Sequence, residues 1–552
     1  MMNKPLLKVQ NLNVCVSDKN GDEVKIVDDI SFDIKPSEVI ALIGESGSGK
    51  TTISLSCMGY ARPGCHITSG SVALGNENVL SKSLKELQTL RGKEITYVAQ
   101  SAAASFNGAM TINSQVTEIP IITKTMTKNE ALNKAEKLYD ALELPNPKTI
   151  GLRYPHQVSG GQLQRLMAAM AMISDPKLLI LDEPTTALDV TTQIEVLHAF
   201  KKLIKDNNTA AIYVTHDLSL VAQIADHILV LKDGKQIEYG TTDQIINNPK
   251  EDYTKALIDA AHVMPDEITS PALQISKNPP LLEVKNVTAG YGKKQEITAI
   301  KGANLSIEPG ETVGVIGESG SGKTTLGRVI SGLMAPKQGQ VFLNGQVLQS
   351  NLSKRSREEL RDIQFAFQMA DVALNPRQKI GKILGRPMQF YRKISNKEME
   401  YEVEKLLTRV DLPTEFIRRF PTELSGGQRQ RVNLARALAA EPKLIICDEI
   451  TSALDTIVAQ QILDLLASLQ EELGLSYLFI THNIATVAQI SKKIAVMRNG
   501  QIIQSGSVED VLTPPCHEYT QLLLNSVPEM RTDWLDGAVV ERRQLLSKLK
   551  TR

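Results

Sequence analysis

The chain has 552 residues, which at roughly 100 to 200 residues per domain predicts three or four folding units and excludes a single small domain. Hydrophobic residues make up 42% and charged residues 22%, so neither wholesale disorder nor a fibrous protein fits. Lys plus Arg (62) equals Asp plus Glu (62), so the summed charge offers no long-range attraction for nucleic acid or for an anionic membrane.

Membrane-spanning, targeting and metal-binding signals are missing from the sequence. No stretch approaches the ~18 to 20 consecutive apolar residues of a membrane helix, and the N-terminus lacks the apolar core of a signal peptide. We therefore expect the chain to stay in the cytosol. The five cysteines form no CxxC pair and have no histidine at ligand spacing, which predicts free buried thiols instead of disulfides or a metal site.

The chain repeats itself. The sequence GESGSGKTT begins at Gly44 and again at Gly317, 273 residues later. The sequence SGGQ begins at Ser159 and at Ser425, 266 residues apart, so the second copy is seven residues shorter between these landmarks. This difference indicates a trimmed loop within one duplicated fold.

The repeats divide the chain into two domains, a linker and a tail. We place the first domain at residues 4–263 and the second at 281–528. Residues 264–280 contain four prolines and little periodicity, which predicts a semi-rigid linker. The tail, residues 529–552, holds the only tryptophan, Trp534, and the amphipathic run VVERRQLLSKL, which predicts a helix without indicating its role.

Each repeat shows the same order of apolar segments. Strands predicted at 39–43 and 312–316 run into the Gly-rich loop, and a helix should follow from Lys-Thr-Thr. Helical inserts come next, with one apolar face at Leu132, Ala135, Leu138 and Leu142 in the first copy and at Val403, Leu406, Leu407 and Val410 in the second. Further strands are predicted at 178–181 and 444–447, and at 211–214 and 478–480.

The Gly-rich loops match the phosphate-binding loop G-x4-GK[ST]. Glycines let successive backbone N–H groups point at phosphates, Lys50 or Lys323 neutralises the outer phosphates, and the hydroxyl of Thr51 or Thr324 ligates magnesium. A chance match is expected in only about a few per cent of chains of this length, and here two matches stand at repeat spacing after predicted strands. The sequence therefore predicts two phosphate sites.

Acidic and histidine side chains follow the next two strands of each repeat. An Asp-Glu pair is usually a solvated loop, but a buried apolar run precedes both copies, which favours a magnesium-shell Asp followed by a water-activating Glu. A lone histidine is more often structural, but its recurrence after a strand at the 266-residue offset favours a γ-phosphate contact. The residues are Asp182, Glu183 and His216 in the first repeat and Asp448, Glu449 and His482 in the second.

Further landmarks recur in both halves. They are Gln100 and Gln368, the signatures Val158-Ser-Gly-Gly-Gln162 and Leu424-Ser-Gly-Gly-Gln428, and Thr186-Ala-Leu-Asp189 and Ser452-Ala-Leu-Asp455. In this order the set resembles the nucleotide-binding subunits of ATP-binding cassette (ABC) transporters, two fused in tandem. The resemblance implies an α/β fold with two P-loop NTPase domains of the ABC type, each a RecA-like core with an antiparallel β subdomain and an inserted helical subdomain.

The resemblance also implies ATP and Mg²⁺ as ligands. Catalytic roles fall to Glu183, Glu449, His216 and His482, and magnesium contacts to Thr51, Gln100, Asp182, Thr324, Gln368 and Asp448. The remaining nucleotide contacts would be Gly44, Ser46, Gly47, Gly49, Lys50, Thr52, Ser159, Gly160, Gly161, Gln162, Asp189, Tyr291, Gly317, Ser319, Gly320, Gly322, Lys323, Thr325, Ser425, Gly426, Gly427, Gln428 and Asp455.

In this family two domains pair head to tail and enclose two ATP molecules. The physics agrees, because Ser-Gly-Gly-Gln opening a helix offers free N–H groups to a phosphate while each domain already has its own phosphate loop. By resemblance, the first site would combine the first phosphate loop with Ser425 and Gly427, and the second site would combine the second loop with Ser159 and Gly161.

A narrower resemblance is to the ATPases of dipeptide, oligopeptide and nickel importers. The segments after the two glutamines, with Asn107 and with Asn375-Pro376, are similar to that subfamily's Q-loop, and both halves end in its tail pattern, with Tyr253-Thr254 and Tyr519-Thr520. The chain departs from the pattern at Gly108, Ile450 and Asn483. None of these departures removes a catalytic group.

The adenine-stacking aromatic distinguishes the two halves. Tyr291 stands at the expected place in the second half, ~25 to 35 residues before the loop lysine, where stacking would contribute about 1 kcal/mol. The matching position in the first half is Val16, which has no aromatic ring, so stacking there would require Phe32 or another aromatic.

The resemblance implies the motor of an ABC importer, in which ATP binding closes the two domains and hydrolysis reopens them. Its partners would be two membrane permease subunits and an extracytoplasmic solute-binding protein, with no nucleic acid. The chain would act at the cytoplasmic face of the inner membrane.

A tandem ATPase that acts on ribosomes is the alternative function, but the long charged linker of that class is missing from the sequence. A DNA-repair ATPase would need zinc-binding cysteines inserted in the domains, and the sequence has none. Peptides lead as solute, and nickel, glutathione-like thiols, opines and oligosaccharides remain open.

Overall fold

A computed structural model describes residues 4–17, 22–185, 188–261, 279–292, 295–452 and 454–550, and these residues form two compact units. The first unit contains the described residues up to 261 together with 455–457 and 528–543, and the second contains the rest. The predicted linker, 264–280, lies outside the described residues except for its last two. So do residues 186, 187 and 453 of the two Ala-Leu-Asp motifs.

The first unit is built on a 10-stranded sheet in the order β5-β4-β1-β2-β10-β9-β3-β8-β7-β6. Its strands are β1 Leu7–Ser17, β2 Glu23–Ile34, β3 Val39–Ile43, β4 Cys65–Leu74, β5 Glu77–Asn78, β6 Ile95–Val98, β7 Leu178–Asp182, β8 Ala210–Val214, β9 His227–Lys232 and β10 Lys235–Thr241. Strands β1, β2, β4 and β5 are antiparallel, and one pairing, Lys235 with Asp28, connects them to the core sheet.

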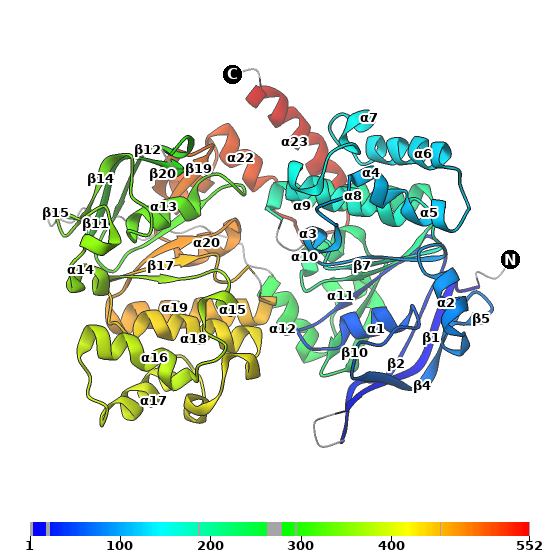
Figure 1. Ribbon diagram of the computed structural model, residues 1–552, viewed down its shortest axis with the longest axis horizontal. Helices are drawn as coiled ribbons and strands as arrows, with labels where there is room; N and C mark the ends of the chain where they lie inside the picture. Colours follow the sequence, from blue (N-terminus) through cyan, green and yellow to red (C-terminus); the bar gives the residue numbers. More distant parts are fainter. Residues whose placement is uncertain are drawn as a thin grey trace. The chain divides into compact units, whose positions relative to one another are not determined.

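The helices of the first unit follow the predicted order. They are α1 Lys50–Ser56, α2 Leu84–Leu90, α3 Ala102–Ser105, α4 Ile112–Val116, α5 Glu118–Ile122, α6 Lys128–Ala141, α7 Pro147–Ile150, α8 Gly160–Met172, α9 Val190–Asp206, α10 Leu218–Ile224, α11 Thr242–Asn247 and α12 Asp252–Ala261, with short 3₁₀ helices η1 Val79–Ser81 and η2 Pro155–Gln157. Figure 1 shows α4, α6, α7 and α8 at one end of this unit and β1, β2, β4 and β5 at the other.

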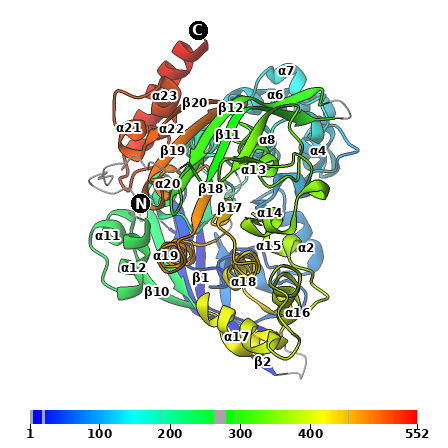
Figure 2. The ribbon, with the colours of Figure 1, turned by 90° about the vertical axis from the view of Figure 1, so that its left-hand side faces the viewer.

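The second unit repeats this architecture with two sheets, β12-β11-β14-β15 and β16-β17-β18-β13-β19-β20. Its strands are β11 Leu282–Tyr291, β12 Ile297–Ile307, β13 Thr312–Ile316, β14 Gln338–Leu343, β15 Gln346–Val347, β16 Ile363–Ala366, β17 Leu444–Asp448, β18 Ser476–Ile480, β19 Lys493–Arg498 and β20 Gln501–Ser507. The antiparallel strands again lie away from the helical insert, which Figure 2 shows at the bottom of the view with α16, α17 and α18.

The second unit's helices correspond to those of the first. They are α13 Lys323–Ile330, α14 Arg357–Asp362, α15 Ala370–Ala373, α16 Ile380–Pro387, α17 Met399–Arg409, α18 Gly426–Leu438, α19 Thr456–Leu473, α20 Ile484–Ile490, α21 Val508–Leu512 and α22 Glu518–Leu524, with 3₁₀ helices η3 Leu352–Lys354, η5 Thr414–Arg418 and η6 Pro421–Glu423 and a π-helix η4 Met388–Arg392. The tail forms α23, Trp534–Lys550, which confirms the predicted helix.

Parallel strands at the centre of each unit deliver the candidate site. Strands β3 and β13 are five-residue apolar runs that are buried throughout, and each pairs in parallel on both sides, with β8 and β9 or with β18 and β19. Such runs suit strands covered on both faces, and their carboxyl ends meet at one edge of the sheet. The Gly-rich loop, the Asp-Glu pair and the histidine therefore meet at that edge.

The core faces of the helical inserts agree with the predicted periodicity except at one residue. Val403, Leu406, Leu407 and Val410 are buried as expected, and so are Ala135, Leu138 and Leu142. Leu132 is only partly buried, because Ala131 and Tyr139 turn toward the core instead. These two residues are in helical phase with Ala135, four residues away on either side.

Two sequence-based expectations about the chain's surface and thiols can be compared with the structure. Among the residues described, no helix is long and apolar enough to cross a membrane. All five cysteines are free thiols, and Cys15, Cys57 and Cys447 are buried as predicted. Cys65 and Cys516 are only partly buried, which corrects the expectation for those two.

Candidate active sites

The Gly-rich loop of each unit joins a central strand to a helix, β3 to α1 and β13 to α13. Gly44 and Gly317 have φ angles of 145° and 149°, and a Cβ at either would collide with a backbone carbonyl oxygen, that of Leu231 or of Met497. Only glycine fits there. Each loop ends on a left-handed glycine, Gly49 or Gly322, that caps the following helix, which leaves its first N–H groups directed toward the loop.

The loop lysines are buried and held by the loop backbone. Lys50 Nζ donates to the carbonyl oxygens of Gly44 (2.7 Å) and Glu45 (2.8 Å), and Lys323 Nζ makes the same contacts with Gly317 (2.7 Å) and Glu318 (2.9 Å). Burial lowers the pKa of Lys50 below its ordinary value, because removal from water penalises the charged ammonium. An anion bound in the loop would provide a negatively charged partner for the lysine ammonium group.

A hydroxyl and a carboxylate lie side by side beneath each loop. Thr51 Oγ1 donates to Asp182 Oδ1 and Thr324 Oγ1 to Asp448 Oδ1, at 3.0 Å in both units. Burial raises the pKa of Asp182, and it raises that of Asp448 to about 6, because each carboxylate is withdrawn from water. A partly buried hydroxyl beside a buried carboxylate provides oxygen donors that suit Mg²⁺.

The glutamate after each aspartate is held in a strained backbone conformation. Glu183 has φ 47° and Glu449 has φ 48°, in the left-handed region that costs a non-glycine residue free energy. Both carboxylate oxygens are engaged: Gln100 Nε2 donates to Glu183 Oε2 (2.8 Å), and His216 Nδ1 lies 3.3 Å from Glu183 Oε1. The structure therefore brings the predicted glutamine, glutamate and histidine together.

The second unit repeats this arrangement. Gln368 Nε2 donates to Glu449 Oε2 (2.7 Å), and His482 Nδ1 lies 3.5 Å from Glu449 Oε1. In the first unit burial alone would lower the pKa of His216, but its hydrogen bond and charge interaction with Glu183 prevail, so the pKa is raised. A histidine so placed can carry a proton beside the carboxylate.

Each signature sequence caps a 13-residue helix, α8 or α18. Ser159 Oγ accepts from Gln162 N (3.3 Å) and Gln162 Oε1 accepts from Ser159 N (3.1 Å), and Ser425 and Gln428 form the same capping box at 3.3 and 3.0 Å. Ser159 and Gly160 are exposed, as are Ser425 and Gly426, so the first turn is accessible to an anion.

The second glycine of each signature has a packing role that the sequence did not reveal. A Cβ on Gly161 would collide with Thr192 of α9, and a Cβ on Gly427 would collide with Val458 of α19. Asp189 caps α9, accepting from Thr192 N (2.9 Å) and from Thr191 Oγ1 (2.8 Å). The signature helix and the helix that follows the Asp-Glu strand are therefore in van der Waals contact at their first turns.

The remaining predicted contacts lie on these loops and helix starts. Ser46, Gly47 and Thr52 belong to the first loop and α1, and Ser319, Gly320 and Thr325 to the second loop and α13. Asp455 lies in the short segment, residues 455–457, that clusters with the first unit.

The candidate adenine position is Tyr291 at the end of β11. Its hydroxyl lies 2.9 Å from Thr325 Oγ1, and the residue is 40% exposed. The strand registers agree with the predicted match, because Val16 pairs with Val24 as Tyr291 pairs with Ile297. Phe32 is buried in the core against β1 and cannot take the place of the tyrosine, which corrects that alternative.

Two tyrosines that sequence reasoning did not assign contact the phosphate loops. Tyr253 Oη accepts from Glu45 N at 3.3 Å, and Tyr519 Oη accepts from Glu318 N at 3.1 Å. Lys232 and Arg498 lie over their rings, at 4.7 and 4.9 Å from the centroids. Both tyrosines belong to the repeated tail pattern at the same 266-residue offset as the histidines, and that recurrence was the available signal.

Similarity to known proteins covers nearly the whole chain. The family model described as ABC transporter matches residues 27–186 and 300–452, and the glutathione import ATP-binding protein GsiA of Escherichia coli O157:H7 is 36% identical over 95% of this chain and 89% of its own. The chain belongs to the ABC transporter family. Its two units are ATP-binding cassettes, and the chain is the ATP-hydrolysing subunit of an importer.

A second family model, another GsiA protein and a solved structure also match parts of the chain. A model described as the oligopeptide/dipeptide transporter C-terminal region matches residues 237–290 and 504–549, which include both tail-pattern tyrosines. The GsiA protein of Salmonella typhimurium strain LT2 is also 36% identical, over 95% of this chain and 90% of its own. Among solved structures, cbiO1 from Clostridium perfringens, part of the ABC transporter complex cbiONQ, is 27% identical and covers 42% of this chain and 90% of that chain, with a TM-score of 0.38.

Proposed function

We propose that each phosphate loop binds MgATP and that the signature of the opposite cassette completes each site. The observation that carries this proposal is the duplicated set in which a strained glutamate is held by a glutamine and a histidine beside a hydrogen-bonded Asp–Thr pair. The first site would comprise Lys50, Thr51, Gln100, Asp182, Glu183 and His216 with Ser425 and Gly427; the second would comprise Lys323, Thr324, Gln368, Asp448, Glu449 and His482 with Ser159 and Gly161.

The magnesium site would be formed by the Thr–Asp pair. Its two oxygen donors are adjacent, and the carboxylate is buried, which fits the ion's preference for hard oxygen ligands. When bound, Mg²⁺ neutralises charge on the β- and γ-phosphates. Lys50 or Lys323 would bind the same phosphates from the loop side, and the helix N-terminus behind the loop would stabilise their negative charge.

Glu183 and Glu449 would act as general bases. A carboxylate fixed from both sides is oriented to accept the proton of a water that attacks the γ-phosphate. His216 would contact the γ-phosphate, and its hydrogen bond to Glu183 would keep that carboxylate in position. The left-handed backbone at the glutamate places its side chain at the carboxyl edge of the sheet, where the loop lies.

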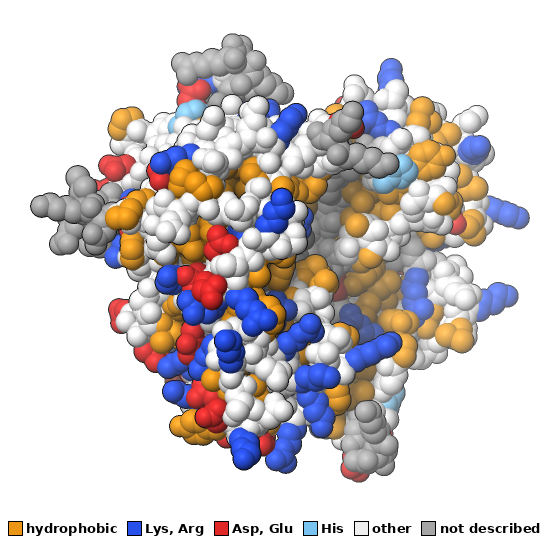
Figure 3. Space-filling view, turned by 60° about the vertical axis from the view of Figure 1, so that its left-hand side comes forward, with side chains coloured by type: hydrophobic (Ala, Val, Ile, Leu, Met, Phe, Trp, Pro, Cys, Tyr) orange, Lys and Arg blue, Asp and Glu red, His pale blue; other side chains and the backbone are white. Residues whose placement is uncertain are grey.

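Exposed apolar side chains beside Gln368 support docking to a permease. Met369 is 61% exposed and Val372 is 79% exposed, on and before the short helix α15. Exposed basic residues follow at Arg377, Lys379 and Lys382, and Figure 3 shows Lys and Arg side chains gathered where the helical insert of the second unit lies. Apolar groups rimmed by charge are typical of a protein interface.

The transported solute is proposed from the relatives. GsiA proteins are named for glutathione import, and the C-terminal model is named for oligopeptide and dipeptide transporters. We therefore propose uptake of small peptides, including tripeptide thiols, through two permease subunits and with an extracytoplasmic binding protein. The chain would act at the cytoplasmic face of the inner membrane.

The test is purification of the full chain from membranes, comparing wild type with Val372→Asp and with Leu473→Asp. Wild type should retain two hydrophobic permease subunits and support ATP-dependent uptake of a labelled small peptide by vesicles. Val372→Asp should lose both while its basal ATPase stays within about twofold, because a charge in the centre of an apolar contact weakens it without touching the nucleotide.

Leu473→Asp is the matched control, since Leu473 is also an exposed apolar residue of the second unit, at 40%, but lies at the end of α19. It should leave co-purification unchanged. Recovery of the wild-type chain chiefly on ribosomes, without permeases, would contradict the proposal.

A further inference from the structure

The segment 528–543, at the end of the chain, packs into the core of the first cassette. Trp534, Leu535 and Ala538 belong to the buried cluster that also contains the signature helix. Gln223 of α10 fixes the segment: its Nε2 donates to the carbonyl oxygens of Glu529 (2.7 Å) and Arg531 (2.8 Å), and its Oε1 accepts from Leu535 N (3.1 Å). The tail segment is thus a built part of this cassette.

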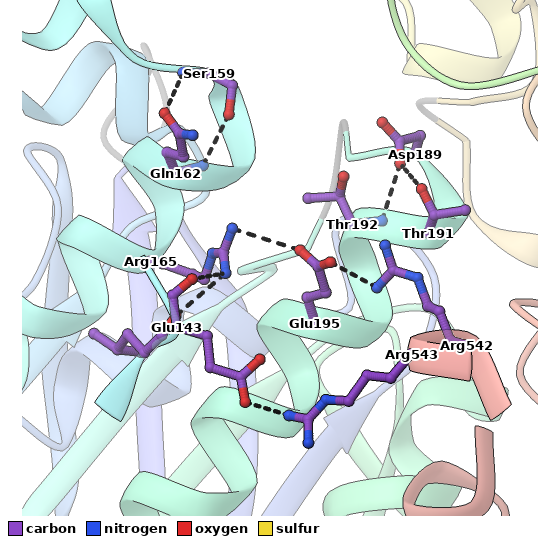
Figure 4. A network of polar contacts seen from close by, with 11 residues as sticks. Glu143, Ser159, Gln162, Arg165, Asp189, Thr191, Thr192, Glu195, Arg542 and Arg543 are labelled. Atoms are coloured by element: carbon purple, nitrogen blue, oxygen red, sulfur yellow. Dashed lines mark hydrogen bonds and ion pairs between the residues drawn. The ribbon is translucent and has the colours of Figure 1, made fainter. Parts of the chain in front are cut away.

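Two consecutive arginines of α23 pair with two glutamates of the first cassette (Figure 4). Arg542 Nη1 lies 2.8 Å from Glu195 Oε1, and Arg543 pairs with Glu143. Arg542 is only 8% exposed. A buried ion pair need not stabilise a fold relative to apolar residues, but removing one partner leaves an uncompensated charge and moves its neighbours.

Glu195 also connects the tail to the signature helix. Its second oxygen, Oε2, lies 3.5 Å from Arg165 Nη2 on α8, and Arg165 Nη1 donates to the carbonyl oxygens of Leu142 (3.2 Å) and Glu143 (3.1 Å). Figure 4 shows Glu195 between the two guanidinium groups. The network therefore joins the tail, α9 and α8 along one continuous set of contacts.

This network lies less than two helical turns from the N-terminal ends of α8 and α9, which carry the signature and the Asp189 cap. Arg165 is six residues after Ser159, and Glu195 is six residues after Asp189. The first turns of α8 and α9 are in contact at Gly161 and Thr192, so a shift of α9 displaces the signature. Close-packed helices transmit such a shift because the contact leaves no free volume.

In the second cassette, the corresponding arginine makes its described contacts with residues of the cassette itself and with none of residues 528–543. Arg431, which corresponds to Arg165, pairs with Asp411 (2.8 Å) and donates to the carbonyl oxygen of Val410 (3.0 Å). Its Nη2 donates to the neutral Gln461 (3.3 Å), which stands where the first cassette has Glu195. Among the described residues, therefore, only in the first cassette does the arginine of the signature helix contact a carboxylate, Glu195, that also pairs with an arginine of the tail, Arg542.

We propose that Arg542 is a positioning residue for ATP hydrolysis: by holding Glu195 it orients α8, so that the end of the chain completes the signature of the first cassette. This inference rests on the proposed function, in which that signature serves ATP bound at the loop of Lys323. The tail would therefore govern the ATP site of the opposite phosphate loop and leave the loop of Lys50, in the cassette it packs on, unaffected.

The test uses the full chain carrying Glu183→Gln and Glu449→Gln, so that bound ATP is retained. A photoreactive ATP analogue with Mg²⁺ is crosslinked, unbound analogue is removed, and labelled peptides containing residues 44–52 or 317–325 are quantified. Arg542→Gln should lower labelling of loop 317–325 by about three- to thirtyfold and change loop 44–52 by no more than about twofold. Arg542→Lys, which keeps the charge, should recover most of the labelling.

Glu195→Gln is a second variant that we expect to fold, because the second cassette carries a glutamine, Gln461, at the corresponding position. It should reproduce the Arg542→Gln pattern, and the double variant should be no worse than either single one, since both remove the same contact. Arg531→Gln, at an exposed arginine of the same segment, is the matched control and should change neither loop.

Three results would overturn the inference: equal losses at both loops, loss confined to loop 44–52, or no loss at either. The first two would mean that the tail merely stabilises the cassette on which it packs. If the parent chain without tail substitutions labels neither loop, the proposal of composite ATP sites fails, and that failure is visible before any tail variant is compared.

Discussion

The two cassettes agree closely in the groups that would touch phosphate and differ in what surrounds them. The Thr–Asp contact is 3.0 Å in both, and the glutamates have φ angles of 47° and 48°. Around these groups the cassettes diverge. Tyr97 donates to Asp182 Oδ2 (2.7 Å) where the second cassette has Phe365, and Val16 stands where the second has Tyr291.

A duplicated ATPase can vary more in the residues that support its site than in the residues that touch the ligand. Groups that contact a phosphate or an attacking water must meet fixed distances, so both copies keep them. Residues that support the site from behind need only keep the contacting residues in position, and different side chains can do this. Asp217 and Asn483 illustrate this, because each caps the following helix, α10 or α20, through its side-chain oxygen.

The largest effect is expected from removing the candidate bases. Glu183→Gln and Glu449→Gln should each cut ATP turnover sharply, since a general base contributes ~10² to 10⁴-fold. ATP binding should persist, because the loop lysines are untouched. Steady-state turnover and equilibrium binding of ATP measure the two effects. If one variant keeps wild-type turnover, the glutamate replaced in it is not a catalytic base, and the two cassettes differ in catalysis as well as in the residues around their sites.

A smaller effect is expected at the adenine position. Tyr291→Ala should weaken ATP at the second site by several-fold to about tenfold, because stacking contributes ~0.5 to 1.5 kcal/mol beyond area burial. Val16→Tyr should tighten the first site. Site-resolved binding of a fluorescent ATP analogue checks both, and no change in either variant would mean that adenine does not lie on this strand end.

Much of this arrangement could be predicted from sequence because its determinants are local. The apolar runs of β3 and β7, the glycines of the phosphate loops and the Asp-Glu pairs each specify their own backbone, and the repeat doubles every signal. The topology of parallel strands then brings their ends together, so the positions of Lys50, Asp182 and His216 were predictable together.

The contacts of the tail could not be predicted, because they join residues far apart in the chain. Arg542 meets Glu195, and Leu535 meets Gln223, more than 300 residues away. Periodicity predicted a helix there but gives no information on which surface it covers. Similarly, the tail pattern singled out Tyr253, but a single sequence does not show that its hydroxyl meets the phosphate loop.

A further prediction concerns these loop-contacting tyrosines. Tyr519→Phe removes the hydrogen bond from Glu318 N, and a typical bond contributes ~0.5 to 1.5 kcal/mol, so ATP affinity at the second loop should fall by about tenfold at most. Tyr253→Phe should have the smaller effect, since its contact is longer, 3.3 against 3.1 Å, and Tyr253 is less buried than Tyr519. Titration calorimetry with MgATP compares them; a larger loss for Tyr253→Phe would contradict this ranking.

The smallest effect is expected from exchanging Tyr97 and Phe365. In magnesium-free buffer at pH 7, Tyr97→Phe should destabilise the first cassette by ~0.5 to 1.5 kcal/mol, because a buried carboxylate loses a donor. Phe365→Tyr should stabilise the second cassette by supplying that donor to Asp448.

The pH dependence of the Phe365→Tyr gain separates this cause from better packing. Burial raises the pKa of Asp448 to about 6, so protonation of this carboxyl favours the folded cassette over the unfolded one. This contribution to stability is lost as the pH rises through about 6. A hydroxyl that donates to the ionised carboxylate lowers this pKa. The stability gained from Phe365→Tyr should therefore grow between pH 5 and pH 7, roughly across the titration of that group, in chemical unfolding of the second cassette. A gain that is the same at both pH values would show that the new hydroxyl does not reach Asp448.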